Sequence, residues 1–132
     1  MNIDKHKERL KESLEVIEES LKIGLIKRQR TIGFSVSAAS SDLLEIYLHK
    51  NKLIEHGFII KHEWFKSKNK LKEKFSFEFE NKEEILDLLY KTEIKRNIFC
   101  YGVPQEEKTI SEVLHNFNKL KKLFQKMGVE IE

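Results

Sequence analysis

The sequence predicts an all-α fold, an antiparallel bundle of four main helices with one short helix or irregular segment. Helix-breaking residues are rare, with one Pro and five Gly among 132 residues, whereas Lys, Glu and Leu, which favour helices, are abundant. Apolar residues also recur at spacings of three and four through most of the chain, as in helices with one buried face. The length fits a single domain over residues 1–132, and short connections favour antiparallel neighbours.

The first predicted helix covers residues 4–29. Its apolar residues share one face and are Leu10, Leu14, Ile17, Leu21 and Leu25. Asp4 is the expected N-cap. Gly24 is expected to weaken this helix slightly near its end.

A second helix is predicted over residues 31–54, with Gly57 as its stop. Its apolar face consists of Ile32, Val36, Ala39, Leu43, Ile46 and Tyr47. The run from Ser35 to Ser41 is built of small residues. Small side chains let another helix approach closely, either within the chain or from a second chain.

Residues 58–80 are open to two interpretations. The segment 58–65 could begin a short helix that the polar residues 66–74 continue before an extended loop. Alternatively, Phe75, Phe77 and Phe79 alternate with polar residues, which is the period of a strand, so 58–65 and 73–79 could pair as a β-hairpin. We favour the short helix and extended loop, because an isolated two-stranded hairpin needs other support.

Two further helices complete the predicted bundle. The first runs from Asn81, an expected N-cap followed by Glu84, to about Tyr101, where Gly102 and Pro104 end it. One face of it carries Ile85, Leu88, Leu89, Thr92, Arg96 and Phe99. The last helix covers residues 106–127 and stops at Gly128. Its apolar face carries Ile110, Val113, Leu114, Phe117, Leu120 and Phe124.

Composition narrows the functional classes. The net charge of +3 lacks the strong basic excess of a dedicated nucleic-acid binder. A single cysteine, Cys100, cannot form an intrachain disulfide, which indicates a reducing compartment, and we expect it to be a buried structural thiol. No apolar run reaches the length of a membrane span and the N-terminus does not resemble a signal peptide, so we expect a cytoplasmic protein with no membrane partner.

No cofactor or metal site is expected. The five histidines are scattered without a pair at ligand spacing, and there is no Gly-rich phosphate loop. Two basic clusters remain. Alternating lysines at 66, 68, 70, 72 and 74 could form a strip that contacts phosphates, or simply a solvated face. Lys27, Arg28 and Arg30 are best explained by a helix C-terminus.

Arg96 is the strongest candidate for a functional residue. It shares a helix face with apolar residues, where a guanidinium is costly without a partner or ligand. One interpretation is a buried or interfacial salt bridge, for example with Glu45 or Asp42. The other is a phosphate contact, in which Asn97 adds a hydrogen bond and Tyr101 flanks the same groove at the helix end.

The segment from Arg96 to Tyr101 resembles the motif of HEPN domains, small helical domains with an Arg and a polar residue near the end of a long helix, followed four to six residues later by His. Chain length and helix number also resemble this family. The resemblance implies a homodimer whose two motifs face one cleft, a toxin-like, metal-independent endoribonuclease, and a minimal nucleotidyltransferase as a partner protein. The catalytic residues it implies here are Arg96, Asn97 and Tyr101.

One departure from the family concerns catalysis. Tyr101 stands where the family has His, and a phenol with an ordinary pKa near 10 is a poor general base at neutral pH. His115 could supply the imidazole if its helix packs nearby. The resemblance thus implies RNA or nucleotide binding, with ribonuclease activity as an extension. The alternatives are a non-catalytic helical module for protein–protein interaction, in which Arg96 is structural, and a plain nucleotide-binding bundle.

Overall fold

The computed structural model describes residues 2–131, and within this range the chain is helical and contains no strand. The long helices are α1 (Ile3–Ile23), α2 (Gln29–Lys50), α4 (Lys82–Tyr101) and α5 (Glu107–Lys126). Two short helices, η1 (His62–Lys66) and α3 (Lys68–Lys74), lie between α2 and α4. The all-α prediction is therefore confirmed. None of the helices within residues 2–131 is long and apolar enough to span a bilayer.

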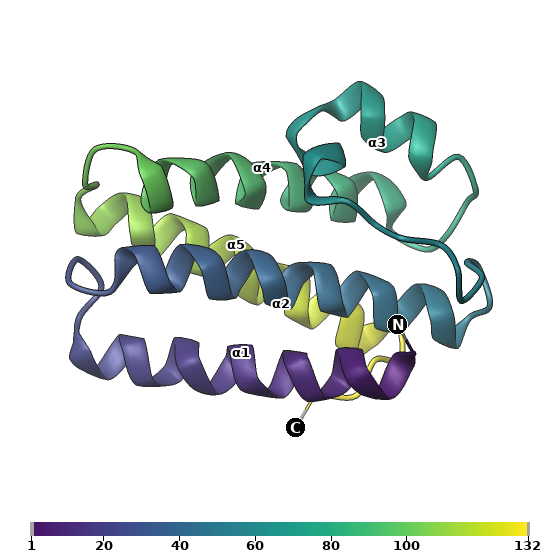
Figure 1. Ribbon diagram of the computed structural model, residues 1–132, viewed down its shortest axis with the longest axis horizontal. Helices are drawn as coiled ribbons and strands as arrows, with labels where there is room; N and C mark the ends of the chain where they lie inside the picture. The colour runs from purple at the N-terminus through teal and green to yellow at the C-terminus, as the bar shows by residue number, and fades with distance from the viewer. Residues whose placement is uncertain (1, 132) are drawn as a thin grey trace.

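The long helices lie side by side, with α2 between α1 and α4 and with α3 over one end of α4 (Figure 1). Helix α2 packs against α1, α4 and α5. This central position follows from its sequence, since most of α2 is buried and Ile32, Val36 and Leu43 have no exposed surface. The run 35–41 belongs to this helix, and its small residues Ser37, Ala39 and Ser40 are buried in the chain's own core.

Helix α1 begins and ends at other residues than predicted. Its N-cap is Asn2 rather than Asp4, because the Asn2 side chain accepts a hydrogen bond from the Lys5 N–H at 3.0 Å. It ends at Ile23, not at residue 29, because Gly24 has a φ of 141° and its N–H donates to the Ser20 carbonyl. A non-glycine residue rarely adopts this φ, so Gly24 terminates the helix rather than weakening it.

Helix α2 also ends early, and the prediction that it reaches residue 54 with Gly57 as its stop is wrong. Asn51 caps it, with its side-chain amide donating to the Tyr47 carbonyl at 2.9 Å. Lys52 then takes a φ of 56°, and the Leu53 N–H returns to the Leu48 carbonyl. An Asn followed by a left-handed residue satisfies the last carbonyls without a glycine.

Residues 58–80 follow the favoured interpretation of a short helix with extended chain, although the helical part begins at His62 rather than near 58. The β-hairpin does not form within the described residues. The alternation still has a meaning, because Phe75 is fully buried and Phe77 and Phe79 are half-buried, whereas Ser76 and Glu78 are exposed. A period of two here marks an extended segment lying on the core without a partner strand.

Helices α4 and α5 match their predicted ranges within one residue at each end. Asn81 is the N-cap residue, but it lies in the left-handed region with φ of 58° and its side chain makes no capping hydrogen bond. Gly102 ends α4, and a Cβ there would lie 2.8 Å from the Ile98 carbonyl oxygen, so glycine is required by close approach. Cys100 is a buried thiol as expected, and burial raises its pKa.

Candidate functional site

Arg96 lies one turn before the end of α4 and is partly buried, with 20% of its side chain exposed. Its Nη1 is 3.5 Å from Oε1 of Glu93, one turn earlier on the same helix. Its guanidinium carbon stands 4.9 Å from the centre of the Phe34 ring, which comes from α2. Arg96 is therefore held between a carboxylate and an aromatic face, an arrangement that favours a guanidinium over an ammonium.

Tyr101, at the end of the same segment of α4, also contacts the Phe34 ring. The rings of Phe34 and Tyr101 meet edge to face, with centroids 6.4 Å apart. Tyr101 is 68% exposed and Phe34 is 39% exposed. Arg96 and Tyr101 do not touch directly, as their spacing on the helix predicts, but Phe34 brings them together. We refer to Phe34, Glu93, Arg96 and Tyr101 as the Arg96 site.

Asn97 is half-buried next to Arg96. It lies on the same turn of α4 as Arg96, and among residues 2–131 its side chain makes no hydrogen bond.

Glu93 is the least exposed charged residue of this region, at 2%. Its Oε2 accepts a hydrogen bond from Ser37 Oγ at 2.8 Å and lies 3.5 Å from Nδ1 of His62. Burial raises the pKa of its carboxyl, but the hydrogen bonds from His62 and Ser37 and the charges of His62 and Arg96 outweigh it, so the pKa lies below the ordinary value. Glu93 is thus an ionised carboxylate linking α2, α4 and η1.

The partner predicted for Arg96 was wrong. Asp42 and Glu45 do not approach the guanidinium; they hold His6 of α1 instead. The true partner, Glu93, stands three residues before Arg96, and that helical spacing was a signal in the sequence. The contact between His62 and Glu93 could not be predicted in this way, because the two residues lie on separate segments that meet only in the folded chain.

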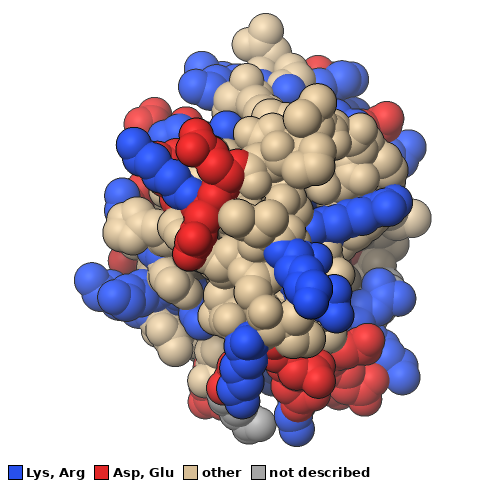
Figure 2. Space-filling model, turned by 90° about the vertical axis from the view of Figure 1, so that its left-hand side faces the viewer, with Lys and Arg blue, Asp and Glu red and all other residues tan. Residues whose placement is uncertain are grey.

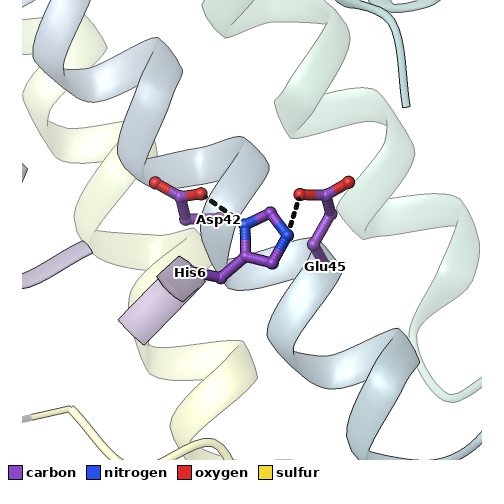
Figure 3. A group of neighbouring side chains, drawn as sticks. All are labelled: His6, Asp42 and Glu45. Atoms are coloured by element: carbon purple, nitrogen blue, oxygen red, sulfur yellow. Dashed lines mark hydrogen bonds and ion pairs between the residues drawn. The ribbon is translucent and has the colours of Figure 1, made fainter. Parts of the chain in front are cut away.

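A second ionic cluster joins α1 to α2 (Figure 3). The buried imidazole of His6 lies between two carboxylates, with Nδ1 2.9 Å from Asp42 Oδ1 and Nε2 2.7 Å from Glu45 Oε2. Burial is the main cause that raises the pKa of both carboxyl groups, against the lowering influence of His6. His49 stacks on His6, and His56 stacks on His49, with centroids 5.9 Å apart in each pair.

Three potential metal ligands meet in this second cluster, since one donor atom each from His6, Asp42 and Glu45 lies within 4.8 Å of the others. This cluster could not be predicted from the sequence, because His6 comes from α1 whereas Asp42 and Glu45 come from α2. Both imidazole nitrogens already face carboxylates on opposite sides (Figure 3). Every buried side-chain polar atom among residues 2–131 has a partner. The three side chains therefore satisfy one another as a hydrogen-bonded triad.

The predicted basic strip does not exist as a strip. The lysines at every second position fall on η1 and α3, where a spacing of two residues places successive side chains on nearly opposite sides. Lys68 pairs with Asp87 at 3.7 Å, and Lys74 lies over the Trp64 ring. The prediction that Lys27, Arg28 and Arg30 lie at a helix C-terminus is wrong, because α1 ends at Ile23. Lys27 and Arg28 lie in the turn between the helices, and Arg30 lies in the first turn of α2.

His115, the imidazole considered as a substitute for the family's histidine, is exposed on α5. It borders a shallow hollow with Lys108, Ser111, Glu112 and Asn116, and none of these residues belongs to the Arg96 site. The imidazole that the structure does bring to Arg96, through Glu93, is His62.

Comparison of the chain with protein-family models, with curated proteins and with solved structures gives no match.

Proposed function

We propose that the protein is a dimeric, HEPN-like RNA-binding protein that cleaves RNA without a metal ion, with Arg96, Asn97 and Tyr101 in its site. The observation that carries the proposal is the placement of the Arg96 guanidinium on the Phe34 ring beside the exposed Tyr101 ring. This combines a fixed cation for phosphate with aromatic faces for bases, the two elements that recur in sites for single-stranded nucleic acid.

The role of Arg96 follows from its contacts. Its single ion pair among the described residues is long, at 3.5 Å, and uses Nη1 alone. A guanidinium has five N–H donors in a planar fork, so most of them remain for a phosphate. The ring of Phe34 holds the fork in place without using these donors. Arg96 would bind the phosphate and stabilise the charge that develops on it during cleavage.

Tyr101 and Asn97 have supporting roles in this proposal. The exposed phenol ring of Tyr101 offers a stacking surface for a base, which is worth about 1–3 kcal/mol for each stacked base. Its hydroxyl adds a donor for a phosphate or leaving oxygen. The Asn97 amide, on the next residue after Arg96, adds a neutral hydrogen bond to the phosphate.

The homodimer is supported by the end of the bundle where α1 turns into α2 and α4 into α5. Large apolar side chains are exposed there, namely Leu21, Ile23, Ile26, Phe34, Tyr101 and Val103. Figure 2 views this end and shows uncharged surface across its middle, bordered by Lys and Arg side chains and, on the left and below, by Asp and Glu side chains. Such patches on soluble domains mark interaction surfaces, and a two-fold axis here would bring two Arg96 sites together.

Val103→Glu tests the dimer. Val103 is 77% exposed at this end, and Ile59, which is 71% exposed on another segment, provides the matched control as Ile59→Glu. Sedimentation should give a dimer for the wild type and the control and a monomer for Val103→Glu. A monomeric wild type would remove the dimer from the proposal. Co-purification with a nucleotidyltransferase encoded beside the gene tests the second partner that the resemblance implies.

The experiment for the activity is cleavage of single-stranded RNA in EDTA by the wild type, by Arg96→Ala and by Lys122→Ala. Lys122 is exposed on α5, so its substitution removes one positive charge away from the Arg96 site. We expect cleavage by the wild type and the control and a loss of about 10²-fold or more in Arg96→Ala, with unchanged helical content. Equal cleavage or RNA affinity in Arg96→Ala would refute the assignment.

The second candidate function is a module for binding another protein, and the exposed apolar end of the bundle favours it. In that case Arg96 serves only to fix Phe34 and Glu93. The two functions differ in one result, because an interaction module would show neither RNA cleavage nor RNA binding while Val103→Glu would abolish its complex. Competition of RNA binding by mononucleotides separates a plain nucleotide-binding bundle from both.

A further inference from the structure

A cavity of about 690 Å³ lies along α2, between α1 and the segment that leads into η1. Its volume is in the range of small-molecule and nucleotide sites. Arg9 and Ser13 line it from α1, Ala38 and Ser41 from α2, and His62 from η1. We call this the α1–α2 cavity.

The α1–α2 cavity and the Arg96 site share one face of α2. Phe34, Ala38, Ser41 and Glu45 follow one another at spacings of four, three and four, so they form a stripe along the helix. Phe34 carries the Arg96 guanidinium, and the other three line the cavity. An extended ligand along this stripe therefore contacts Arg96 at one end and His62 farther along.

His62 is held by Glu93. Its Nδ1 lies 3.5 Å from Glu93 Oε2, and 48% of its side chain is exposed. The other oxygen of the same carboxylate contacts Arg96. The imidazole and the guanidinium thus face the two oxygens of one buried carboxylate, so Glu93 holds both side chains.

This contact also sets the tautomer of His62. A carboxylate beside Nδ1 favours the proton on that nitrogen, which leaves the lone pair on Nε2 for a substrate. The carboxylate is suited to this role, because Glu93 is 2% exposed and is fixed by Ser37. A buried carboxylate, an imidazole and an open Nε2 are the arrangement by which proteins orient a general base.

We propose that His62 is the general base of the Arg96 site and supplies the imidazole that the motif itself lacks, with Glu93 as its positioning residue. The inference rests on the proposed ribonuclease function and names the catalytic group within it. The substrate class is RNA, since the reaction needs a 2′-hydroxyl next to the phosphodiester bond.

The proposed step is an intramolecular transfer. Nε2 of His62 takes the proton of the 2′-hydroxyl, and the 2′-oxygen forms a bond to phosphorus. The bond between phosphorus and the 5′-oxygen breaks, and the leaving 5′-oxygen takes a proton from water. The hydroxide so formed removes the proton from the imidazolium, which restores His62. The products carry a 2′,3′-cyclic phosphate and a 5′-hydroxyl, while Arg96 offsets the charge on the phosphate oxygens.

The charged and titratable groups around His62 come from three helices. Glu93 and Arg96 face it from α4, Asp42 and Glu45 from α2, and His6, Arg9 and Glu12 from α1 across the cavity. His62→Ala removes the base and leaves Ser37 and Arg96 as partners of Glu93, and His115→Ala is the matched control because it removes an exposed imidazole on α5.

The test measures single-turnover cleavage of single-stranded RNA in EDTA across pH for the wild type, His62→Ala, His115→Ala and Arg96→Ala. We expect His62→Ala to lose about 10²–10⁴-fold in rate, to lose the acid limb of the pH profile, and to regain activity with added imidazole. RNA affinity should stay near that of the wild type, since the base acts in the reaction more than in binding. His115→Ala should match the wild type in rate and profile.

Three results would overturn the inference, and they are distinguishable. Cleavage that depends on Arg96 but persists at the wild-type rate in His62→Ala overturns the role of His62 and leaves the proposed function standing. A His62→Ala variant that is slower but keeps the acid limb and gains nothing from imidazole shows a structural role and also overturns it. A wild type that neither binds nor cleaves RNA refutes the proposed function and this inference together.

Discussion

Substitution of His6 by Leu is expected to lower the free energy of unfolding by about 3–5 kcal/mol at neutral pH. The imidazole is 4% exposed and faces Asp42 at 2.9 Å and Glu45 at 2.7 Å. Leu fills a similar volume but has no N–H group. The two carboxylates, one helical turn apart on α2, then lose their shared partner and repel each other, and an uncompensated buried charge is costly.

The environment of the carboxylates places the loss toward the lower end of this range. The side chains of Asp42 and Glu45 keep 10% and 13% of their surface exposed, and both border the α1–α2 cavity. Water in the cavity can therefore hydrate them in part. Even about 3 kcal/mol is a large share of a total stability of about 5–15 kcal/mol.

The loss should depend on pH in a defined direction. Burial already raises the pKa of Asp42 and Glu45, and removing His6 removes an influence that lowers both. A carboxyl group whose pKa is raised in the folded state stabilises the fold below its unfolded pKa of about 4. This contribution is lost as the pH rises through the pKa of the folded state. The deficit of His6→Leu should therefore shrink as the pH falls from neutral toward about 5.

Urea unfolding at the two pH values measures this deficit. Adding Asp42→Asn and Glu45→Gln to His6→Leu should recover most of the stability, because no buried charge remains. His115→Leu, the same change at an exposed histidine of α5, is the control and should alter stability by less than about 0.5 kcal/mol. A loss below about 1 kcal/mol, or one that does not change with pH, would refute the reasoning.

Four further predictions concern the Arg96 site and its surroundings. Glu93→Gln should make the protein lose less stability in acid than the wild type does. A carboxyl with a lowered pKa stabilises the fold above its unfolded pKa of about 4.3, and this contribution is lost as the pH falls through the folded pKa. Urea unfolding from neutral pH to about pH 3 measures the change. Arg96→Ala should lower the slope of log affinity for single-stranded RNA against log salt by about 0.7, the value for one phosphate contact, and an unchanged slope would exclude that contact. EDTA should leave the thermal midpoint unchanged, because both nitrogens of His6 are engaged by carboxylates, and a fall in the midpoint on dialysis would show a bound metal. Gly33→Val should cost about 1–3 kcal/mol by thermal or urea unfolding, since a Cβ at Gly33 already lies 3.0 Å from Phe99, and an unchanged midpoint would show that α4 moves freely.

Much of the fold could be predicted from the sequence because apolar periodicity extends over whole helices. The faces of α4 and α5 were correct, with Ile85, Leu89, Ile110 and Phe117 all buried. The errors are the predicted ends of α1 and α2, because the φ angle of a single residue determines where each helix stops. Gly24 and Lys52 both take positive φ values, and nothing in the apolar pattern distinguishes a glycine that ends a helix from one that a helix tolerates.

Only the part of the candidate site that lies within a few residues on one helix could be predicted from the sequence. Arg96 stood out because a guanidinium on an apolar helix face is unusual, and Glu93 was within reach of the same reasoning at a spacing of three residues. Phe34 and His62 were not, because each contacts the site only after α2 and η1 pack against α4. A cluster built from three separate elements leaves no periodic signal in the chain.

The two buried ionic clusters are difficult to explain by stability alone. Glu93 has partners from α2, α4 and η1, and His6 lies between two carboxylates of α2. Apolar residues of similar size in such positions often give an equally or more stable fold. Both clusters nevertheless reach the same α1–α2 cavity, one through His6 and the other through His62. The convergence of these charged groups, which are costly to bury, on one cavity is the observation that supports the proposed chemistry at this face of α2.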